Sequence, residues 1–105
     1  MRRNTQQASR DETLPPPDKD LLQDLVRALV EQSGEVEVKE NVDTQTGTSH
    51  FVIYADRRDR GKVIGKNGRT IDAIRTIFMS IASLESRKVF IEVYEPRRSE
   101  NNHYR

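Results

Sequence analysis

The chain has 105 residues, a third of them charged and a third hydrophobic, and its 18 basic and 17 acidic side chains give a formal net charge of +1. This length supports one small domain, because two separate cores would fall below the roughly 50 residues that a domain needs. The absence of Cys excludes disulfides, thiolate metal sites and Cys nucleophiles, and a net charge near zero argues, as a sum, against a polyanionic partner.

Both ends of the chain are predicted to be disordered tails, over residues 1–17 and 96–105. The first tail is polar and ends in three prolines, which disfavour helix. The second has no aliphatic residue after Pro96. The N-terminus lacks the apolar stretch of a secretory signal, and no run of about 18 uncharged apolar residues is present to cross a bilayer. We therefore expect a cytoplasmic protein whose folded domain spans residues 18–95.

An amphipathic helix is predicted directly after the prolines. Asp18 is placed to cap its first turn, because a carboxylate at this position can accept a hydrogen bond from a free backbone N–H. Six apolar residues then recur at helical spacing on one face: Leu21, Leu22, Leu25, Val26, Leu29 and Val30. The pair Ser33-Gly34 is expected to end the helix.

Two strands are predicted next. Residues 35–42 alternate valines with charged residues, and Glu40 interrupts the apolar face in the manner of an edge strand. After a turn rich in Asp, Thr and Gly, residues 50–55 form a second strand, which the short connection makes antiparallel to the first. His50 begins this strand beside polar turn residues, so we expect it to be an exposed structural residue.

The second half of the chain predicts two helices and a strand. Residues 59–64 allow one or two helical turns, residues 70–84 form a longer helix, and residues 88–94 form the last strand. The longer helix carries apolar residues at helical spacing: Ile71, Ile74, Ile77, Phe78 and Ile81. A crossover through two helices favours a parallel strand pair, with both helices on one face of the sheet. The first helix must cover the same face, which predicts a two-layer α+β fold with a three-stranded mixed sheet.

Charge is distributed unevenly along the chain. Residues 18–56 hold three basic and nine acidic side chains, a net charge of −6, whereas residues 57–75 hold seven basic and two acidic side chains, a net charge of +5. A local basic patch attracts polyanions whatever the total charge is. The charge distribution alone is equally consistent with an ordinary solvated surface that binds nothing.

A glycine-rich segment, Gly65-Lys66-Asn67-Gly68, lies at the centre of the basic stretch, between the two predicted helices. Glycine lets the backbone turn sharply and approach a ligand closely. The helix that follows directs unpaired N–H groups and its positive dipole end at the loop, which favours an anion. Four basic side chains surround this point: Arg60, Lys62, Lys66 and Arg69. The segment therefore predicts a phosphate contact, and the alternative is a purely structural helix-to-helix turn.

The phosphate-binding loop of nucleotide hydrolases does not fit this segment. That loop needs four residues between its first glycine and the Gly-Lys pair, followed by Ser or Thr. Here only three residues separate Gly61 from Gly65-Lys66, and Asn67 stands where a hydroxyl should hold magnesium. We expect no catalysis, no cofactor and no metal site.

The run from Val63 to Ile71, followed by Ile74-Arg75, resembles the Ile-Gly-x-x-Gly signature of KH domains, which clamp a few nucleotides of a single strand. The element order is similar to that of the type II KH fold, with an extra helix and strand before the core. Over residues 21–95 the chain resembles the small bacterial KhpA-type proteins. The stretch 56–59 is more basic than expected for that family, and both tails are longer than the domain needs.

The resemblance implies a single-stranded RNA-binding protein of low sequence specificity and an RNA chaperone. It also implies a homodimer or a heterodimer with a KhpB-like KH protein, and a link to cell shape and cell-wall homeostasis, with no membrane and no small-molecule substrate. Its RNA contacts would be Arg60, Lys62, Ile64, Gly65, Lys66, Asn67, Gly68 and Arg69. Val63 and Ile71 would adjoin Ile64 on an apolar floor, and we expect Ile71 to be core.

Aromatic residues do not flank the loop, which argues against a base-stacking platform of the RRM kind. Recognition should then depend on phosphates, base edges and aliphatic contacts. The alternative from another functional class is a KH-fold protein-interaction module, which uses its acidic first helix or its sheet to organise a partner and binds RNA only incidentally.

Overall fold

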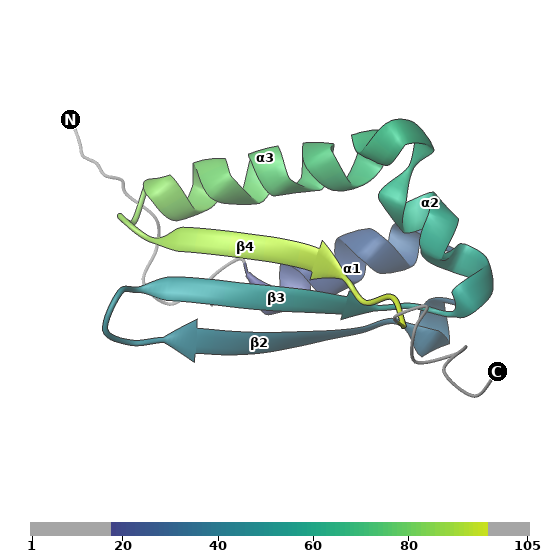
Figure 1. Cartoon of the computed structure of the whole chain (residues 1–105), viewed down its shortest axis with the longest axis horizontal. Helices are drawn as coiled ribbons and strands as arrows, with labels where there is room; N and C mark the ends of the chain where they lie inside the picture. The colour runs from purple at the N-terminus through teal and green to yellow at the C-terminus, as the bar shows by residue number, and fades with distance from the viewer. Residues whose placement is uncertain (1–17, 97–105) are drawn as a thin grey trace, which may run out of the picture.

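The computed structural model describes residues 18–96, and its elements follow the predicted order (Figure 1). The helices are α1 (Lys19–Leu29), α2 (Arg60–Ile64) and α3 (Arg69–Ser83), and the strands are β2 (Glu37–Asp43), β3 (Thr48–Tyr54) and β4 (Lys88–Val93). Three short 3-10 turns are η1 (Ser33–Glu35), η2 (Arg57–Asp59) and η3 (Lys66–Gly68). The predicted disordered tails, apart from Pro96, lie outside the described residues.

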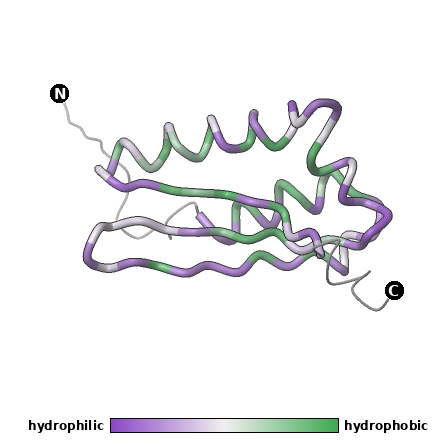
Figure 2. The backbone as a smooth tube through the Cα atoms, in the orientation of Figure 1, coloured by the Kyte–Doolittle hydropathy of each residue, from purple (hydrophilic) through white to green (hydrophobic). Residues whose placement is uncertain are grey.

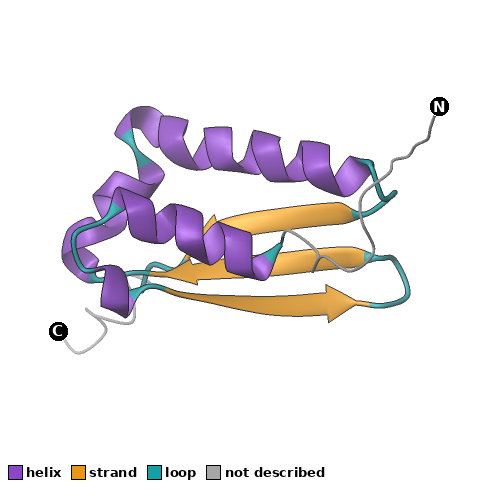
Figure 3. Ribbon diagram, turned by 180° about the vertical axis from the view of Figure 1, so that it is seen from behind, coloured by secondary structure: helices purple, strands orange, loops and turns teal. Residues whose placement is uncertain are grey.

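The described domain has two layers, with the helices on one face of a three-stranded sheet (Figure 3). The strand order is β2-β3-β4. Strands β2 and β3 are antiparallel, with Asp43 opposite Thr48, and β3 and β4 are parallel, with His50 opposite Phe90. The predicted α+β fold with a mixed sheet is therefore confirmed. So is the edge position of the first strand, which Glu40 indicated.

The core lies between the sheet and the helices. Phe51 and Ile53 of β3 are fully buried against Phe78 of α3 and against Leu22 and Val26 of α1. Hydrophobic positions recur along the helices and strands, as their spacing in the sequence requires (Figure 2). Burying each such side chain stabilises the fold by about 1.5–3 kcal/mol relative to leaving it exposed. The core is therefore large enough to hold α2 and its neighbouring turns in one place on the sheet.

Asp18 differs from its predicted role as a helix cap. Its carboxylate accepts no hydrogen bond from the first turn of α1. Instead, it forms an ion pair at 3.1 Å with the guanidinium of Arg87, in the turn between α3 and β4. Arg87 also contacts Glu85 at 2.9 Å. The charge of Arg87 draws the carboxylate away from the helix end, so that Asp18 ties the start of α1 to the distant α3–β4 connection.

Several residues of the predicted apolar faces are more exposed than their spacing indicates. Ile77 is half exposed, because the buried row of α3 turns out to be Ile71, Ile74, Phe78 and Ala82. Ile77 lies about 100° around the helix from Phe78, at the border of that row. On α1, Leu21 and Leu29 are likewise exposed while Leu22 and Val26 are buried.

The face of the sheet opposite the helices carries stacked rings. His50 stacks on Phe90 with centroids 5.1 Å apart, and Tyr54 stacks on Tyr94 at 4.9 Å. The Lys39 ammonium lies 5.1 Å from the centre of the Tyr54 ring. His50 is exposed, as predicted, but its partnership with Phe90 arises from the parallel register of β3 and β4, which the sequence does not specify.

Length and polarity separate the described helices from membrane-spanning ones. Within residues 18–96, no helix combines the length and the apolar character that crossing a bilayer requires.

Candidate nucleic-acid interface

The glycine-rich segment forms a sharp turn between α2 and α3. Gly65 has φ 80° and ψ 167°, Asn67 has φ 57° and ψ 27°, and Gly68 has φ 75° and ψ 12°. Glycine adopts positive φ freely and Asn tolerates it. The Gly65 N–H donates to the Gly61 carbonyl at 2.8 Å, and the Gly68 N–H donates to the Gly65 carbonyl at 3.1 Å. The Gly-Lys-Asn-Gly sequence therefore produces the tight helix-to-helix turn that it predicted.

The two glycines of the turn serve different purposes. A Cβ on Gly65 would lie 2.6 Å from the backbone nitrogen of Thr70 and 2.7 Å from its Cβ, so no side chain fits there. The backbone angles of Gly65 also belong to a region that other residues essentially never adopt. A Cβ on Gly68 would have only the Asp72 carboxylate within reach, at 4.0 Å. Gly65 thus permits close packing of the turn on α3, whereas Gly68 supplies only a left-handed backbone.

Both residues in the middle of the turn, Lys66 and Asn67, are exposed, and so is Arg69 at the start of α3. Within residues 18–96, neither Lys66 nor Arg69 has an ion-pair partner. The N–H of Arg69, the first residue of α3, donates to the Lys66 carbonyl, and the next N–H groups lack partners within this fifteen-residue helix. Two free cations and a helix N-terminus therefore meet at one exposed point, which is suited to an anion.

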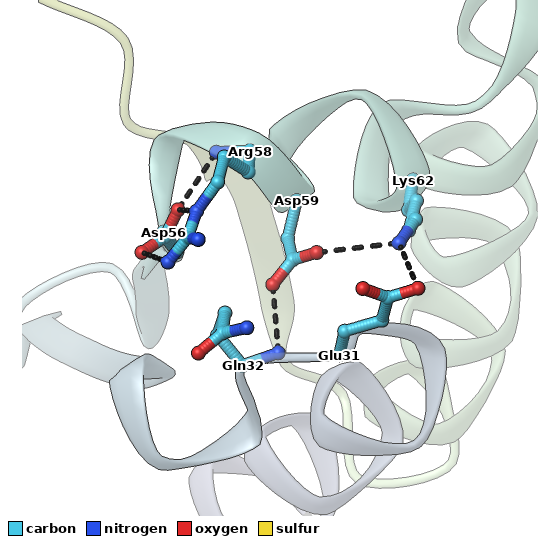
Figure 4. A network of polar contacts seen from close by, with 6 residues as sticks. All are labelled: Glu31, Gln32, Asp56, Arg58, Asp59 and Lys62. Atoms are coloured by element: carbon cyan, nitrogen blue, oxygen red, sulfur yellow. Dashed lines mark hydrogen bonds and ion pairs between the residues drawn. The ribbon is translucent and has the colours of Figure 1, made fainter.

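At the start of α2, a buried carboxylate fixes this helix to the residues that follow α1 (Figure 4). Asp59 is 1 % exposed, and its Oδ2 accepts a hydrogen bond from the Gln32 N–H at 2.9 Å. Its Oδ1 lies 3.5 Å from the Lys62 Nζ. The pKa of Asp59 is held below its usual value, first by the Gln32 N–H and further by Lys62. The carboxylate thereby joins α2 to the chain that follows α1.

Lys62, one of the predicted RNA contacts, takes part in this same network. Its Nζ lies 3.2 Å from Glu31 Oε2 and 3.5 Å from Asp59 Oδ1. The hydrogen bond to Glu31 is the largest cause of the raised pKa of Lys62. Its predicted contact with RNA stays a prediction, but a phosphate would have to compete with two carboxylates for this ammonium.

The arginines around the start of α2 differ in whether they have an ion-pair partner. Arg58 is bound to Asp56 by two guanidinium contacts, at 2.9 and 3.1 Å, and its backbone N–H also donates to that carboxylate at 2.8 Å (Figure 4). These contacts lower the pKa of Asp56 to about 2. Asp59, in contrast, is turned inward to Gln32 and Lys62 and has no ion pair with the neighbouring arginines. Among residues 18–96, this leaves Arg57 and Arg60 without an ion pair.

The apolar residues next to the turn divide by burial. Val63 is fully buried and Ile71 is 4 % exposed, so both belong to the core, as was expected of Ile71. Ile64 is half buried and packs against the core from its edge. Of the three proposed floor residues, Ile64 alone presents substantial apolar surface beside the loop.

A groove of about 430 Å³ lies along the free edge of β4. Its lining residues come from α3 and the sheet: His50, Arg75, Met79, Val89, Phe90, Ile91 and Glu92. The Arg75 Nε donates to the Ile91 carbonyl at 2.9 Å, while its NH1 contacts Asp72 at 2.8 Å. Sequence reasoning noted Arg75 in the motif but missed Met79 and Phe90. The signal that could have found Met79 is its position four residues after Arg75 on the same helix face.

No three His, Cys, Asp or Glu side chains within residues 18–96 are arranged to hold a metal ion.

Comparison with known proteins agrees with this geometry. Residues 19–93 match the family described as KhpA/KhpB, KH domain. The chain is 42 % identical over 82 residues to a protein of Chlamydia caviae named RNA-binding protein KhpA, covering 75 % of this chain and 99 % of the relative. It is 43 % identical over 79 residues to the protein of the same name from Chlamydia trachomatis serovar D, with the same coverage.

A more distant relative, from Clostridium acetobutylicum, has the same name and is 36 % identical over 75 residues, covering 71 % of this chain and 97 % of the relative. No solved structure matches the chain significantly. The family match spans the whole of the sheet and the helices, including the glycine turn. The chain therefore belongs to the KhpA/KhpB family of KH-domain proteins.

Proposed function

We propose that this protein binds single-stranded RNA through the turn Gly65–Gly68 and the start of α3. The observation that carries the proposal is the exposed pair of unpaired cations, Lys66 and Arg69, beside a backbone held open by two glycines. Relatives that share 36–43 % identity are named RNA-binding proteins, which supports RNA as the ligand. RNA as the ligand in turn supports a cytoplasmic location.

In the proposed complex, backbone phosphates lie against the turn. The N–H groups at the start of α3 donate to phosphate oxygens, and Lys66 and Arg69 neutralise their charge. The bases then lie over Ile64 and along the groove beside β4, where Met79 provides apolar contact. Because phosphates and aliphatic surface read little base identity, we expect low sequence specificity and a strong dependence on salt.

A turn that holds about four nucleotides gives a small footprint. Joining two such sites raises the effective concentration of the second and so the overall affinity. We therefore propose that the protein acts as a homodimer or together with a KhpB-like KH protein. We also propose a role as an RNA chaperone in post-transcriptional control linked to cell shape and cell-wall homeostasis. Membership of the KhpA/KhpB family supports these roles.

The RNA-binding proposal is tested by reversing charge in the middle of the turn. Replacing the glycines is a poor test, because a side chain at Gly65 collides with Thr70. Lys66 and Asn67 are both exposed, and Asp tolerates the left-handed backbone of Asn67. The variant K66D/N67D should therefore keep its thermal unfolding midpoint. Its affinity for a fluorescently labelled single-stranded RNA, measured by anisotropy, should fall at least tenfold.

The matched control is K19D/Q45D, which changes net charge equally at two exposed positions, the start of α1 and the β2–β3 turn. This control should keep most of the wild-type affinity. Equal losses in the two variants would mean that only net charge matters, and an unchanged affinity in K66D/N67D would refute the proposed site.

A second candidate function is a protein-interaction module, favoured by the ring-bearing outer face of the sheet. Phe90 is 56 % exposed there and Tyr94 is 41 % exposed, and each ring stacks on a residue of β3. The substitution Y94K lies outside the groove beside β4, and it should abolish self-association or binding of a KhpB-like protein if this face is the interface, as measured by light scattering on a sizing column. If the protein is mainly a protein-interaction module, RNA cross-linked to the wild-type protein in cells should be scarce. The RNA-binding proposal requires this RNA to be abundant.

A further inference from the structure

A second basic site lies at the other end of α2 from the glycine turn. Arg57, Arg60, Glu95 and Pro96 line a cavity of about 480 Å³ between turn η2, the first residue of α2 and the segment after β4. It does not share a lining residue with the groove beside β4. The family resemblance implied Arg60 as an RNA contact, but nothing in the motif implied Arg57 or a separate cavity.

The two arginines of this cavity differ from their neighbours in being unpaired. Arg58 is held by Asp56, and Lys62 by Glu31 and Asp59. Arg57 and Arg60 have no ion-pair partner within residues 18–96, and the Arg60 Nε is buried with no hydrogen-bond partner at all. A buried donor left unsatisfied is costly, and native structures seldom keep one. Because this Nε is closed off from solvent, a ligand reaches it only if the Arg60 side chain turns toward the cavity that it lines.

The charges in the cavity indicate which acceptor fits. Two guanidinium groups and the Glu95 carboxylate sum to a net charge of +1. A phosphodiester carries a single negative charge and accepts paired N–H donors from arginine. The carboxylate of Glu95 disfavours ligands of higher negative charge.

The spacing of the two sites suits one nucleic-acid strand. Helix α2 has five residues, so its ends lie roughly 6 Å apart along the axis. Gly65 follows its last residue, and Arg60 is its first. That distance is about one nucleotide of an extended strand, so a strand whose first four nucleotides occupy the turn and the groove beside β4 reaches Arg60 with one or two more.

We propose that Arg57 and Arg60 bind a second backbone phosphate of the RNA strand held at the glycine turn, so that the binding site is longer than the turn alone. This proposal rests on the proposed function. It makes a specific claim about length: an RNA of about four nucleotides fills the turn only, and longer strands gain affinity by reaching the arginine site.

The test measures affinity against length, using labelled oligouridylates of four to ten nucleotides and the full chain. Wild-type affinity should rise about tenfold once the strand reaches the second site. The variant R57Q/R60Q should bind the four-nucleotide RNA like wild type but lose that gain. Its slope of log affinity against log salt for the ten-nucleotide RNA should decrease by about 0.7, the value for one phosphate on a single strand.

The matched control is R27Q/R58Q, which also removes two positive charges, from arginines that are already paired with Asp24 and Asp56. It should keep the wild-type length dependence. If R57Q/R60Q behaves like R27Q/R58Q, the arginine site is refuted while the glycine turn stands. If instead K66D/N67D leaves the binding of every RNA unchanged, the proposed function fails, whatever the arginine variant does.

Two further measurements distinguish the arginine site from an effect on folding and from a site for a small anion. If replacing Arg60 lowers the thermal unfolding midpoint, R57Q alone carries the test, because Arg57 is exposed. Inorganic phosphate, added at constant ionic strength, should compete with the ten-nucleotide RNA only weakly. Strong competition at millimolar phosphate, with no dependence on RNA length, would indicate a small-anion site and would overturn the proposal.

Discussion

The basic residues of the segment 57–75 fall into two groups that differ in what they contact. Arg58, Lys62 and Arg75 are engaged with carboxylates or with a strand carbonyl. The other four have no ion pair within residues 18–96: Arg57, Arg60, Lys66 and Arg69. Lys62 and Arg75 hold α2 and α3 to neighbouring elements, and Arg58 pairs only with the nearby Asp56. The free group lies at the two ends of α2.

This division shows that the local net charge of +5 overstates how many cations a ligand can use. A cation that already has a carboxylate partner gives little to a phosphate, since the phosphate must displace that partner. The engaged cations contribute to binding only indirectly, by positioning the backbone that carries the free ones. Substitutions of Lys62, Arg75 or their partners should therefore change the stability of the fold. Substitutions of the free cations should change the affinity for RNA.

The largest expected loss of stability comes from adding a side chain at Gly65. G65A should destabilise the fold by about 3 kcal/mol or more, because it adds a collision with Thr70 to a backbone conformation reserved for glycine. G68A should cost only about 1–2 kcal/mol, because its Cβ meets open space and only the left-handed backbone is unfavourable. Denaturant unfolding of both variants gives the two values. Equal losses would show that the contact of the turn with α3 is not needed.

Removal of the buried carboxylate is expected to have the next largest effect. D59A leaves the Gln32 N–H without its acceptor and Lys62 without one of its two carboxylates. Its thermal unfolding midpoint should fall by roughly 5–15 °C. D56A is the matched control, because it removes a carboxylate that pairs with the exposed Arg58. A drop in D56A as large as that in D59A would contradict the anchoring role of Asp59.

The same two carboxylates predict how stability changes in acid. Both pKa values are lowered in the fold, that of Asp56 to about 2 and that of Asp59 mainly by the Gln32 N–H. Below the unfolded-state value of about 4, the unfolded chain binds more protons than the folded one, so stability falls as the pH drops. The stabilisation that the two ionised carboxylates give is complete above the unfolded-state pKa of about 4, and it is lost as the pH falls through their folded-state pKa values.

Unfolding midpoints measured from pH 7 to pH 2 test this expectation. The wild type and D59N should differ at neutral pH and converge in acid, because protonation removes in the wild type the charge that the substitution removes at every pH. Parallel curves would show that Asp59 titrates normally in the fold.

The fold was largely predictable from the sequence, because apolar spacing and short connections determine a two-layer sheet of this kind. The glycine turn was predictable as well, since its backbone needs glycine. Long-range polar partners could not be predicted from the sequence. Asp18 pairs with Arg87, which lies 69 residues away, and Asp59 accepts a hydrogen bond from Gln32, which lies 27 residues away. Charge spacing predicts local pairs only, so it could not separate Lys62, which is engaged, from Arg57 and Arg60, which are free.

The smallest expected effect, and the most direct test of the two groups, compares two lysines four residues apart. K66Q should reduce the slope of log affinity against log salt by about 0.7 and leave the unfolding midpoint unchanged, because its ammonium contacts no carboxylate in the described domain. K62Q should do the reverse, lowering the midpoint by a few degrees with little change in slope, because its charge is already used by Glu31 and Asp59. If the slope of log affinity against log salt falls equally in K66Q and K62Q, a phosphate displaces the carboxylates from Lys62. Ion pairing within the fold would then not decide which cations bind RNA.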